Sequence, residues 1–206
     1  MTPITVPIVR QGDGAVNRDD YLGWASSIAP QMVSALNASA YRRMSAIDGL
    51  INEDDRLAAL RDMGVLNDVS NPRFDDVVEM ARNLFGTDTA ALSFIDIDRV
   101  WIKSFAGIDP GQLSRSEGVC ALTIQRSELL VIEDLSIDPR YRSWVRRTGG
   151  PRFYAGYPIE SGNGQRVGSL CLLDSKPRKF SERDHTLLRQ LALRIQAIAG
   201  DVERRP

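Results

Sequence analysis

Several residue types are scarce in this chain of 206 residues, and each shortage excludes a class of protein. Only two cysteines occur, Cys120 and Cys171, so the chain has no disulfide framework and suits the reducing cytoplasm, where we expect it. The single histidine, His185, is too few for most zinc sites and for a histidine-based catalytic triad, and we predict no metal site. No apolar stretch approaches the length of a membrane span and the amino terminus lacks a signal-peptide pattern, so we expect no membrane association.

The chain also has no excess of charge of one sign. The formal net charge is −1, from 26 Lys and Arg against 27 Asp and Glu, so no overall field attracts DNA or anionic lipid. We therefore expect no nucleic-acid partner. The chain does have an ordinary globular composition, with 43% hydrophobic and 26% charged residues, and its length suits one domain with an appendage.

Residue patterns divide the chain into three parts. Residues 1–16 carry no periodicity and contain two prolines and two glycines, which is typical of a flexible tail. In residues 17–51 an apolar stripe at three- and four-residue steps predicts a helical extension for dimerisation or docking, interrupted at Pro30. Its members are Tyr21, Trp24, Ile28, Met32 and Leu36. Residues 52–206 form the predicted domain.

Within residues 52–206 the sequence predicts helices at both ends and five or so antiparallel strands between them. The helices cover residues 53–63, capped by Asn52, residues 72–85, ended by Gly86, and a segment that starts after Ser181. The strands cover residues 89–96, 100–105, 129–133, 153–160 and 166–174. Between them lie a loop at 107–118, a short apolar segment at 119–124 and one or two helical turns at 139–145. This order indicates an α+β domain with helices on a face of the sheet.

Several blocks of this domain follow one another in the order of a known family. The most specific are FYAGYPI at residues 153–159 and GSLCLLD at 168–174, and weaker blocks are RLAAL at 56–60, DIDRVWIK at 96–103 and VCA at 119–121. The combination resembles a stand-alone bacterial GAF domain, a sensor module of signalling proteins. The resemblance implies a mixed sheet with helices on one face and a ligand cavity on the other, closed by loops and short helices. It also implies a small-molecule-sensing regulatory function without enzymatic activity.

One position departs from the family pattern. In many relatives a histidine follows the Cys-Ala pair, whereas Leu122 stands there in this chain. The departure argues against carrying metal, haem or bilin binding over to this segment. The family is diverse in function, so the ligand does not transfer with the fold.

A cationic segment with aromatic residues provides candidates for ligand binding. Residues 139–152 contain five arginines and no acid, and Tyr141 and Trp144 are interleaved with them. Arginine forks and stacked rings suit an anionic, ring-bearing ligand such as a cyclic nucleotide. The same charges also suit a solvated helix face or a docking surface for an acidic partner. From this region we select Arg140, Tyr141 and Tyr154 as candidate ligand-binding residues.

Three further candidates lie elsewhere. If Val100 and Ile102 face the helices, Trp101, Lys103 and Phe105 face the cavity, whereas the reverse arrangement makes Lys103 an ordinary surface lysine. Asp134 and the Asp-Pro-Arg turn at 138–140 together resemble a feature of the family. We expect Asp134 either to contact the ligand or to brace its own loop.

Cys120 supports two hypotheses, a packed core thiol or a ligand-contacting and redox-active one. In the second case the protein is a thiol-based redox sensor or a methionine sulfoxide reductase-like enzyme, although the chain lacks most of the family's neighbouring cysteines. A disulfide with Cys171 requires Cα atoms within about 7 Å. A third hypothesis is a protein-interaction module without a ligand.

The terminal helices provide the expected output. We expect a homodimer through them, or a docking face for a separate kinase or cyclase; the alternative is that the stripe of residues 17–51 packs on its own domain. Ligand binding then acts by population shift, favouring one arrangement of loops and end helices.

Overall fold

One six-stranded antiparallel sheet organises the part of the chain that the computed structural model describes, namely residues 52–67, 70–111 and 113–203. The strand order is β3-β2-β1-β6-β5-β4. The strands are β1 (Thr89–Ile95), β2 (Arg99–Gly107), β3 (Leu113–Ser114), β4 (Leu130–Ile132), β5 (Phe153–Glu160) and β6 (Arg166–Asp174). The predicted tail and helical extension, residues 1–51, lie outside the described residues.

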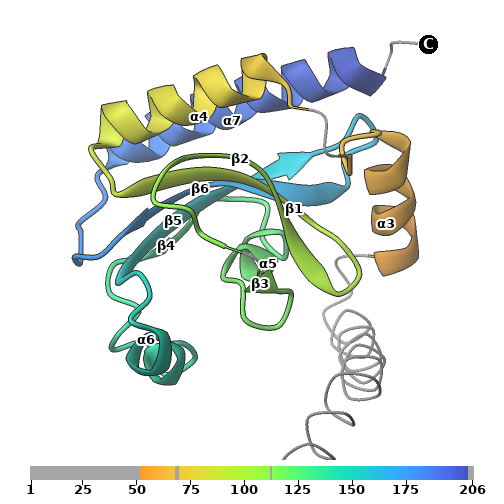
Figure 1. The fold of residues 1–206 in the computed structure, drawn as a ribbon. Coiled ribbons are helices and arrows are strands. Elements are labelled where there is room, and N and C mark those ends of the chain that lie inside the picture. Colours follow the sequence, from red (N-terminus) through yellow and green to blue (C-terminus); the bar gives the residue numbers. More distant parts are fainter. Residues whose placement is uncertain (1–51, 68–69, 112, 204–206) are drawn as a thin grey trace, which may run out of the picture. The chain divides into compact units, whose positions relative to one another are not determined.

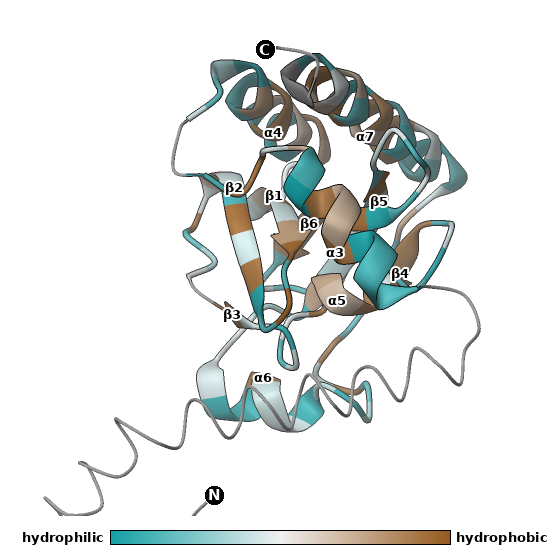
Figure 2. Ribbon diagram, turned by 90° about the vertical axis from the view of Figure 1, so that its right-hand side faces the viewer, coloured by the Kyte–Doolittle hydropathy of each residue, from teal (hydrophilic) through white to brown (hydrophobic). Residues whose placement is uncertain are grey.

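Helices cover both faces of this sheet. On one face lie α4 (Pro72–Phe85) and α7 (Glu182–Glu203), side by side in Figure 1, with α3 (Glu53–Asp62) at one end. On the other face lie the much shorter α5 (Cys120–Thr123) and α6 (Arg142–Thr148). In Figure 2 the strands between these layers are largely brown, while teal segments alternate along the helices. The sheet is therefore covered by long helices on one side and by short helices and loops on the other.

The central strand β1 has two buried faces. Ala90, Leu92 and Phe94 belong to the core under α4 and α7. Ala91 and Ile95 alternate with them and belong to a second core under α5 and α6. Every residue of β1 is buried, so neither cover can be removed without exposing apolar surface.

Local signals placed most elements correctly. Asn71 accepts a hydrogen bond from the Arg73 amide at the start of α4, and Gly86 ends the helix as predicted. Helix α4 and strands β5 and β6 have the predicted bounds. The main differences are that the 107–118 loop contains β3, the 119–124 segment contains α5, α6 begins three residues later than expected, and β2 is longer than the predicted 100–105. β3 has only two residues, too few for a detectable alternation.

One expectation about the sheet is wrong, and one open alternative is decided. The mixed sheet implied by the resemblance is instead antiparallel in each described pairing. In β2, the register shifts between its pairing with Leu92 and with Ser93, so that Lys103 is an extra residue. Val100 and Ile102 therefore pack in the core under α5 and α6, and Trp101 packs against the other core. This is the reverse of the arrangement that directs Trp101 and Lys103 toward the cavity.

A buried ion network attaches α3 to the sheet. Arg56, fully buried, donates from Nε and Nη2 to the carboxylate of Glu53 at 2.9 and 2.7 Å, and from Nη1 to the Ile95 carbonyl. Arg115 donates to the same carboxylate and, at 3.0 Å, to the Asp96 carbonyl. Burial raises the pKa of Glu53, but the two guanidinium groups outweigh it and hold this pKa below its usual value. The network joins α3, the β1–β2 turn and the loop after β3.

Replacing Arg56 by leucine tests this network. The change removes one of the two guanidinium groups that surround the buried Glu53 carboxylate, so we expect Arg56→Leu to lower the free energy of unfolding by about 3–5 kcal/mol. Denaturant-induced unfolding measures it. Arg61→Leu on the exposed side of the same helix is the control, with an expected change within about 0.5 kcal/mol. Equal effects of the two changes would contradict a structural role for the network.

Candidate functional site

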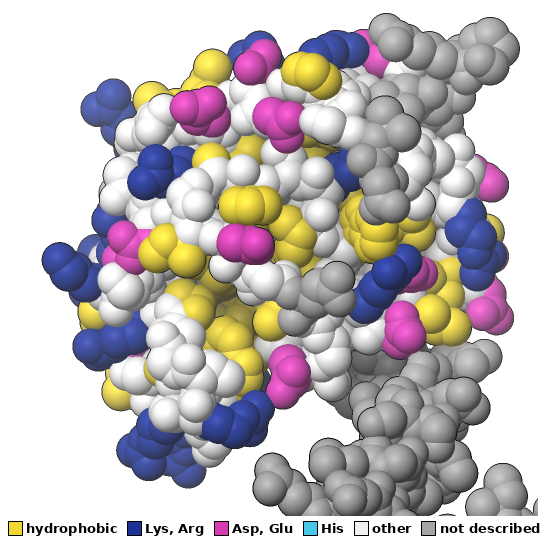
Figure 3. Space-filling view, in the orientation of Figure 1, with side chains coloured by type: hydrophobic (Ala, Val, Ile, Leu, Met, Phe, Trp, Pro, Cys, Tyr) yellow, Lys and Arg dark blue, Asp and Glu magenta, His cyan; other side chains and the backbone are white. Residues whose placement is uncertain are grey.

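A pocket of about 650 Å³ opens on the face of the sheet that the short helices cover. Its walls are the ends of β1 and β6, the loop that follows β2, and α6. We call it the α6 pocket, and its apolar lining includes Ile108, Leu113, Trp144 and Leu173. Figure 3 shows Lys and Arg side chains gathered over α6 at the lower left, and hydrophobic side chains in the hollow beside it.

Helix α6 directs Trp144 into this pocket. Tyr141 and Val145, four residues apart, are buried in the second core and hold one face of the helix against the domain. Trp144 is half-buried on the neighbouring face. A Cβ atom added to Gly150 would lie 2.9 Å from Cη2 of Trp144, so the glycine provides the space that the indole ring needs.

An ion pair joins α6 to the loop on the opposite side of the pocket. Arg147 of α6 donates to Glu117 of the loop at 2.9 Å, and the two side chains are 64% and 47% exposed. Exposed pairs of this kind contribute at most about 1 kcal/mol. The α6 side and the loop side are therefore joined by a contact that a ligand can displace.

Acidic residues outnumber basic ones in the lining. Four lining residues are acidic, and Arg147 is the one base among the described lining residues. Glu117 is paired with Arg147 and Asp174 with Arg178, which leaves Asp88 and Asp109 without an ion pair among the described residues. Hydrogen bonds from the side chain and backbone of Ser175 lower the pKa of Asp88, and Arg178 and Lys176 lie near enough to lower it further, so this group is ionised at neutral pH. The lining therefore favours a neutral or cationic ligand over a phosphate.

The predicted arginine and tyrosine candidates lie outside this lining. Arg140 donates from Nε and Nη2 to Asp138, which raises the pKa of Arg140, and Asp138 lies only two residues away. Tyr141 is buried, and burial raises its pKa to about 12. Tyr154 is fully buried, with its hydroxyl 2.7 Å from that of Thr123. None of these three is among the described residues that line the α6 pocket.

Asp134 braces its loop, which is one of the two roles expected for it. Its carboxylate accepts hydrogen bonds from the guanidinium of Arg152 and from the amide and hydroxyl of Ser136. The bond from Arg152 is the main reason that the pKa of Asp134 falls to about 2. Arg152 is thus paired with Asp134, and its backbone carbonyl accepts the Leu135 amide.

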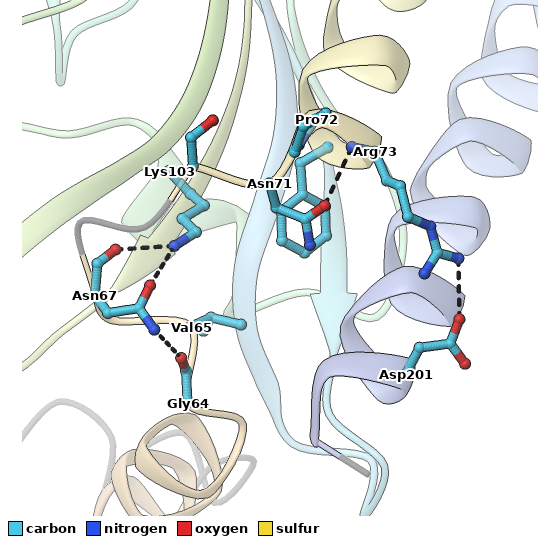
Figure 4. Close-up of a pocket in the computed structure, with 10 residues that line it drawn as sticks. Gly64, Val65, Asn67, Asn71, Pro72, Arg73, Lys103 and Asp201 are labelled. Carbon is cyan, nitrogen blue, oxygen red and sulfur yellow. Dashed lines mark hydrogen bonds and ion pairs between the residues drawn. The ribbon is translucent and has the colours of Figure 1, made fainter. Parts of the chain in front are cut away.

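Lys103 lies at a second, smaller pocket of about 320 Å³ (Figure 4). Its Nζ donates to the carbonyl and the side-chain oxygen of Asn67, each at 2.9 Å, and Arg73 pairs with Asp201 across the same opening. The guanidinium carbon of Arg99 lies over the indole ring of Trp101, 4.3 Å from the ring centroid. The sheet separates Trp101 and Lys103 from the core that contains Cys120.

Cys120 lies in a polar cluster inside the second core. Its Sγ is 3.8 Å from Sγ of Cys171, and both thiols are free and buried. Hydrogen bonds, first from Cys171 and then from nearby hydroxyls, lower the pKa of Cys120 to about 6, although burial opposes this. The hydrogen bond that the Cys171 thiol donates to Cys120, together with burial, raises the pKa of Cys171 well above its usual value.

Sequence reasoning missed most of the α6 pocket. Trp144 and Arg147 belong to the cationic segment of residues 139–152, but Ile108, Leu113 and Glu117 come from the loop at 107–118, which the sequence does not mark as part of a site. The one sequence feature that could have indicated this part of the pocket is the presence of apolar residues in a loop that also contains glycine. Among the described residues no group of three or more His, Cys, Asp or Glu side chains is placed to hold a metal, and no helix there is long and apolar enough to cross a membrane.

Comparison with known proteins agrees with this fold. The family model of the GAF domain matches residues 71–198. A cyclic di-GMP phosphodiesterase of Pseudomonas aeruginosa is 32% identical over 149 residues, which are 71% of this chain and 25% of that relative. The chain thus spans about a quarter of the length of this relative.

Solved structures show the same fold. The GAF domain of an Acinetobacter phosphoenolpyruvate-protein phosphotransferase has a TM-score of 0.52 and 21% identity, over 71% of this chain and 93% of that chain. A free methionine-R-sulfoxide reductase of Neisseria meningitidis has a TM-score of 0.54 and 18% identity, over 71% and 87%. At these identities the likeness concerns the fold, and function depends on the site.

The brace at Asp134 generates a prediction about pH. Its pKa is lowered in the folded protein, so its ion pair stabilises the fold at neutral pH and is lost as the pH falls from about 4 to about 2. We expect Asp134→Asn to be less stable than the natural protein at pH 6, and the difference to shrink below pH 4. Urea midpoints across this range measure it. Asp62→Asn, at the exposed end of α3, is the control, and a difference that does not change with pH would contradict the assignment.

Proposed function

The chain belongs to the GAF domain family, and we propose that it is a regulatory sensor that binds a small molecule in the α6 pocket. The observation that supports this best is the pocket itself, whose two sides are joined across its mouth by the exposed pair Arg147–Glu117. Its volume of about 650 Å³ lies within the range of small-molecule sites. GAF domains are a common small-molecule-sensing regulatory module, so the fold and the pocket favour the same function.

The lining suggests the class of ligand. Trp144 offers a ring for stacking, and Ile108, Leu113 and Leu173 surround it with apolar surface. Asp88 and Asp109 add negative charge to the lining. We therefore propose a neutral or cationic, ring-bearing ligand. A cyclic nucleotide, which the arginines of residues 139–152 suggested, fits this lining poorly because its phosphate would meet carboxylates.

The pocket loop connects ligand binding to α3. Glu117, at the mouth, lies two residues after Arg115, which donates to Glu53 of α3. A ligand that separates Arg147 from Glu117 shifts the loop and changes the fit of Arg115 in the buried network. The ligand then favours one of two arrangements of loop and α3, which is a population shift. The helix that receives the change follows residues 17–51 directly in the sequence.

We propose that the output partner is a signalling enzyme, such as a kinase or cyclase, and that the role of this domain is regulatory rather than catalytic. The phosphodiesterase of Pseudomonas aeruginosa supports a signalling context, because a quarter of its length corresponds to this chain. A reductase role has weaker support. The chain has only two cysteines, and both are buried.

Thermal unfolding with a set of ligands tests the sensor proposal. We expect a neutral or cationic aromatic heterocycle to raise the melting temperature, because binding to the folded state alone adds about 2.7 kcal/mol at one hundred times Kd. Trp144→Ala should abolish the shift, while Trp101→Ala, whose side chain packs on the other side of the sheet, should retain it. Native mass spectrometry of the protein from a bacterial host identifies any ligand carried through purification. A response to cyclic nucleotides alone, unchanged in Trp144→Ala, would overturn the proposed site.

We further propose that the chain forms a homodimer through the apolar stripe of residues 17–51. Light scattering coupled to size-exclusion chromatography should give twice the chain mass. The double variant Trp24→Asp, Ile28→Asp should be monomeric, because it places two charges in the stripe. Leu84→Asp is the control on the exposed side of α4 and should remain dimeric. A natural protein that elutes with the mass of a monomer would contradict the proposed dimer.

A further inference from the structure

We propose that Cys120 and Cys171 form a reversible disulfide on exposure to a hydroperoxide, which makes the core under α5 an oxidation-sensitive modification site. The two residues are 51 positions apart in the sequence, one at the start of α5 and the other in the central strand β6. The proposal concerns a second input to the domain and stands whether or not the α6 pocket binds a ligand.

The sulfur atoms are already close. Their separation of 3.8 Å exceeds a disulfide bond, about 2.05 Å, by less than about 2 Å. Helix α5 packs directly against β5 and β6 and has only four residues, so a small shift of the segment with rotation of both side chains closes this gap. The alternative, a pair of inert packing thiols, does not require this proximity.

The surroundings of the thiols are unusually polar for a core. Ser93 and Ser169 are fully buried and lie with their hydroxyl oxygens 3.2 Å apart. The hydroxyls of Thr123 and Tyr154, also fully buried, form the second pair. Burying hydroxyl groups is unfavourable unless they hydrogen-bond, and apolar side chains would fill this space without that requirement. The presence of these buried hydroxyl groups is explained if they stabilise the thiolate form of Cys120.

The position of Tyr154 depends on Gly156, two residues further along the same strand, β5. A Cβ atom added to Gly156 would lie 2.7 Å from Cζ of Tyr154, so the ring occupies the space that a side chain at residue 156 would fill. Gly156 pairs with Cys171 across β5 and β6. The tyrosine hydroxyl thereby reaches both Thr123 and the side of the cluster where Cys120 lies, and its hydrogen bond helps to lower the pKa of Cys120.

The two thiols have different roles. The lowered pKa assigns the thiolate to Cys120, and the raised pKa keeps the proton on Cys171. The Cys120 thiolate attacks one oxygen of the hydroperoxide, so an S–O bond forms, the O–O bond breaks, and hydroxide or alkoxide leaves. The Cys171 sulfur then attacks the Cys120 sulfenic acid; the S–S bond forms, the S–O bond breaks and water leaves with the thiol proton. The net change oxidises two thiols to one disulfide and reduces one peroxide.

Access determines the rate of this reaction. Cys120 is 5% exposed and Cys171 is 1% exposed, so the oxidant reaches Cys120 when α5 opens locally. We therefore expect oxidation to be slower than at an exposed thiol and to remain selective for this pair. The disulfide then fixes α5 to β6, directly beyond the loop that contributes Glu117 to the α6 pocket.

Hydrogen peroxide applied to the folded full-length chain tests the proposal. The expected result is the loss of two hydrogens from the intact mass, reversed by dithiothreitol, without formation of a covalent dimer. Trypsin cleavage should release residues 116–126 and 167–178 joined by one disulfide, because an arginine precedes and ends each peptide. Far-UV circular dichroism during the reaction establishes that the chain stays folded.

Single variants separate the steps. Cys171→Ser should stop at a sulfenic acid on Cys120 that a cyclic 1,3-dione traps, and Cys120→Ser should lose the reaction. Tyr154→Phe keeps the ring and removes one hydroxyl, and we expect it to slow the oxidation about threefold. Ser161→Ala, also a buried hydroxyl but in the β5–β6 turn, is the matched control and should react at the natural rate.

Two results would overturn the proposal. One is a folded natural protein that keeps both thiols while its denatured form is oxidised. The other is separate sulfinic acids at the two residues without a cross-linked peptide. Neither result affects ligand-induced thermal shifts measured on the reduced protein, so failure here is distinguishable from failure of the proposed sensor function.

Discussion

Burial of the central strands on both faces is the constraint on which the rest of this structure depends. Every residue of β1 is buried, and β6 beside it is nearly so. A sheet with this composition requires cover on both sides. On one side the cover consists of α4 and α7, whose apolar stripes are long enough to form a continuous core. On the other side it consists of α5, α6 and loops, and this weaker cover is where both candidate sites lie.

Two sets of buried polar groups hydrogen-bond among their own members, one at α3 and one on the weaker side. Glu53 lies between Arg56 and Arg115, so three charges are removed from water together. The hydroxyls and thiols near Cys120 are likewise bonded among themselves. Buried polar sets of this kind contribute more to a unique arrangement than to net stability, because one missing partner leaves the others unsatisfied. They connect α3 and α5 to the sheet in one arrangement.

Membership of the GAF family explains the architecture, whereas the identity of the ligand depends on the residues that line the site. The arginines of residues 139–152 look in sequence like an anion site, yet Asp138 and Asp134 pair with two of them. A third, Arg147, pairs with Glu117, from a loop distant in sequence. What remains at the α6 pocket is an indole ring, apolar side chains and the carboxylates of Asp88 and Asp109, which have no ion pair among the described residues. The chemistry of that surface, rather than the charge of the segment, directs the choice of ligand class.

The sequence by itself determined the elements whose signals are local. Asn71, Pro72 and Gly86 set the bounds of α4, and alternating apolar residues set β5 and β6, because caps and strand periodicity act over a few residues. It also indicated the family from the order of short blocks. The bulge in β2, which places Trp101 and Lys103 on the face covered by α4 and α7, has no such local signal. The α6 pocket and the Cys120–Cys171 pair were decided by the tertiary structure alone, because each joins segments that only the folded sheet brings together.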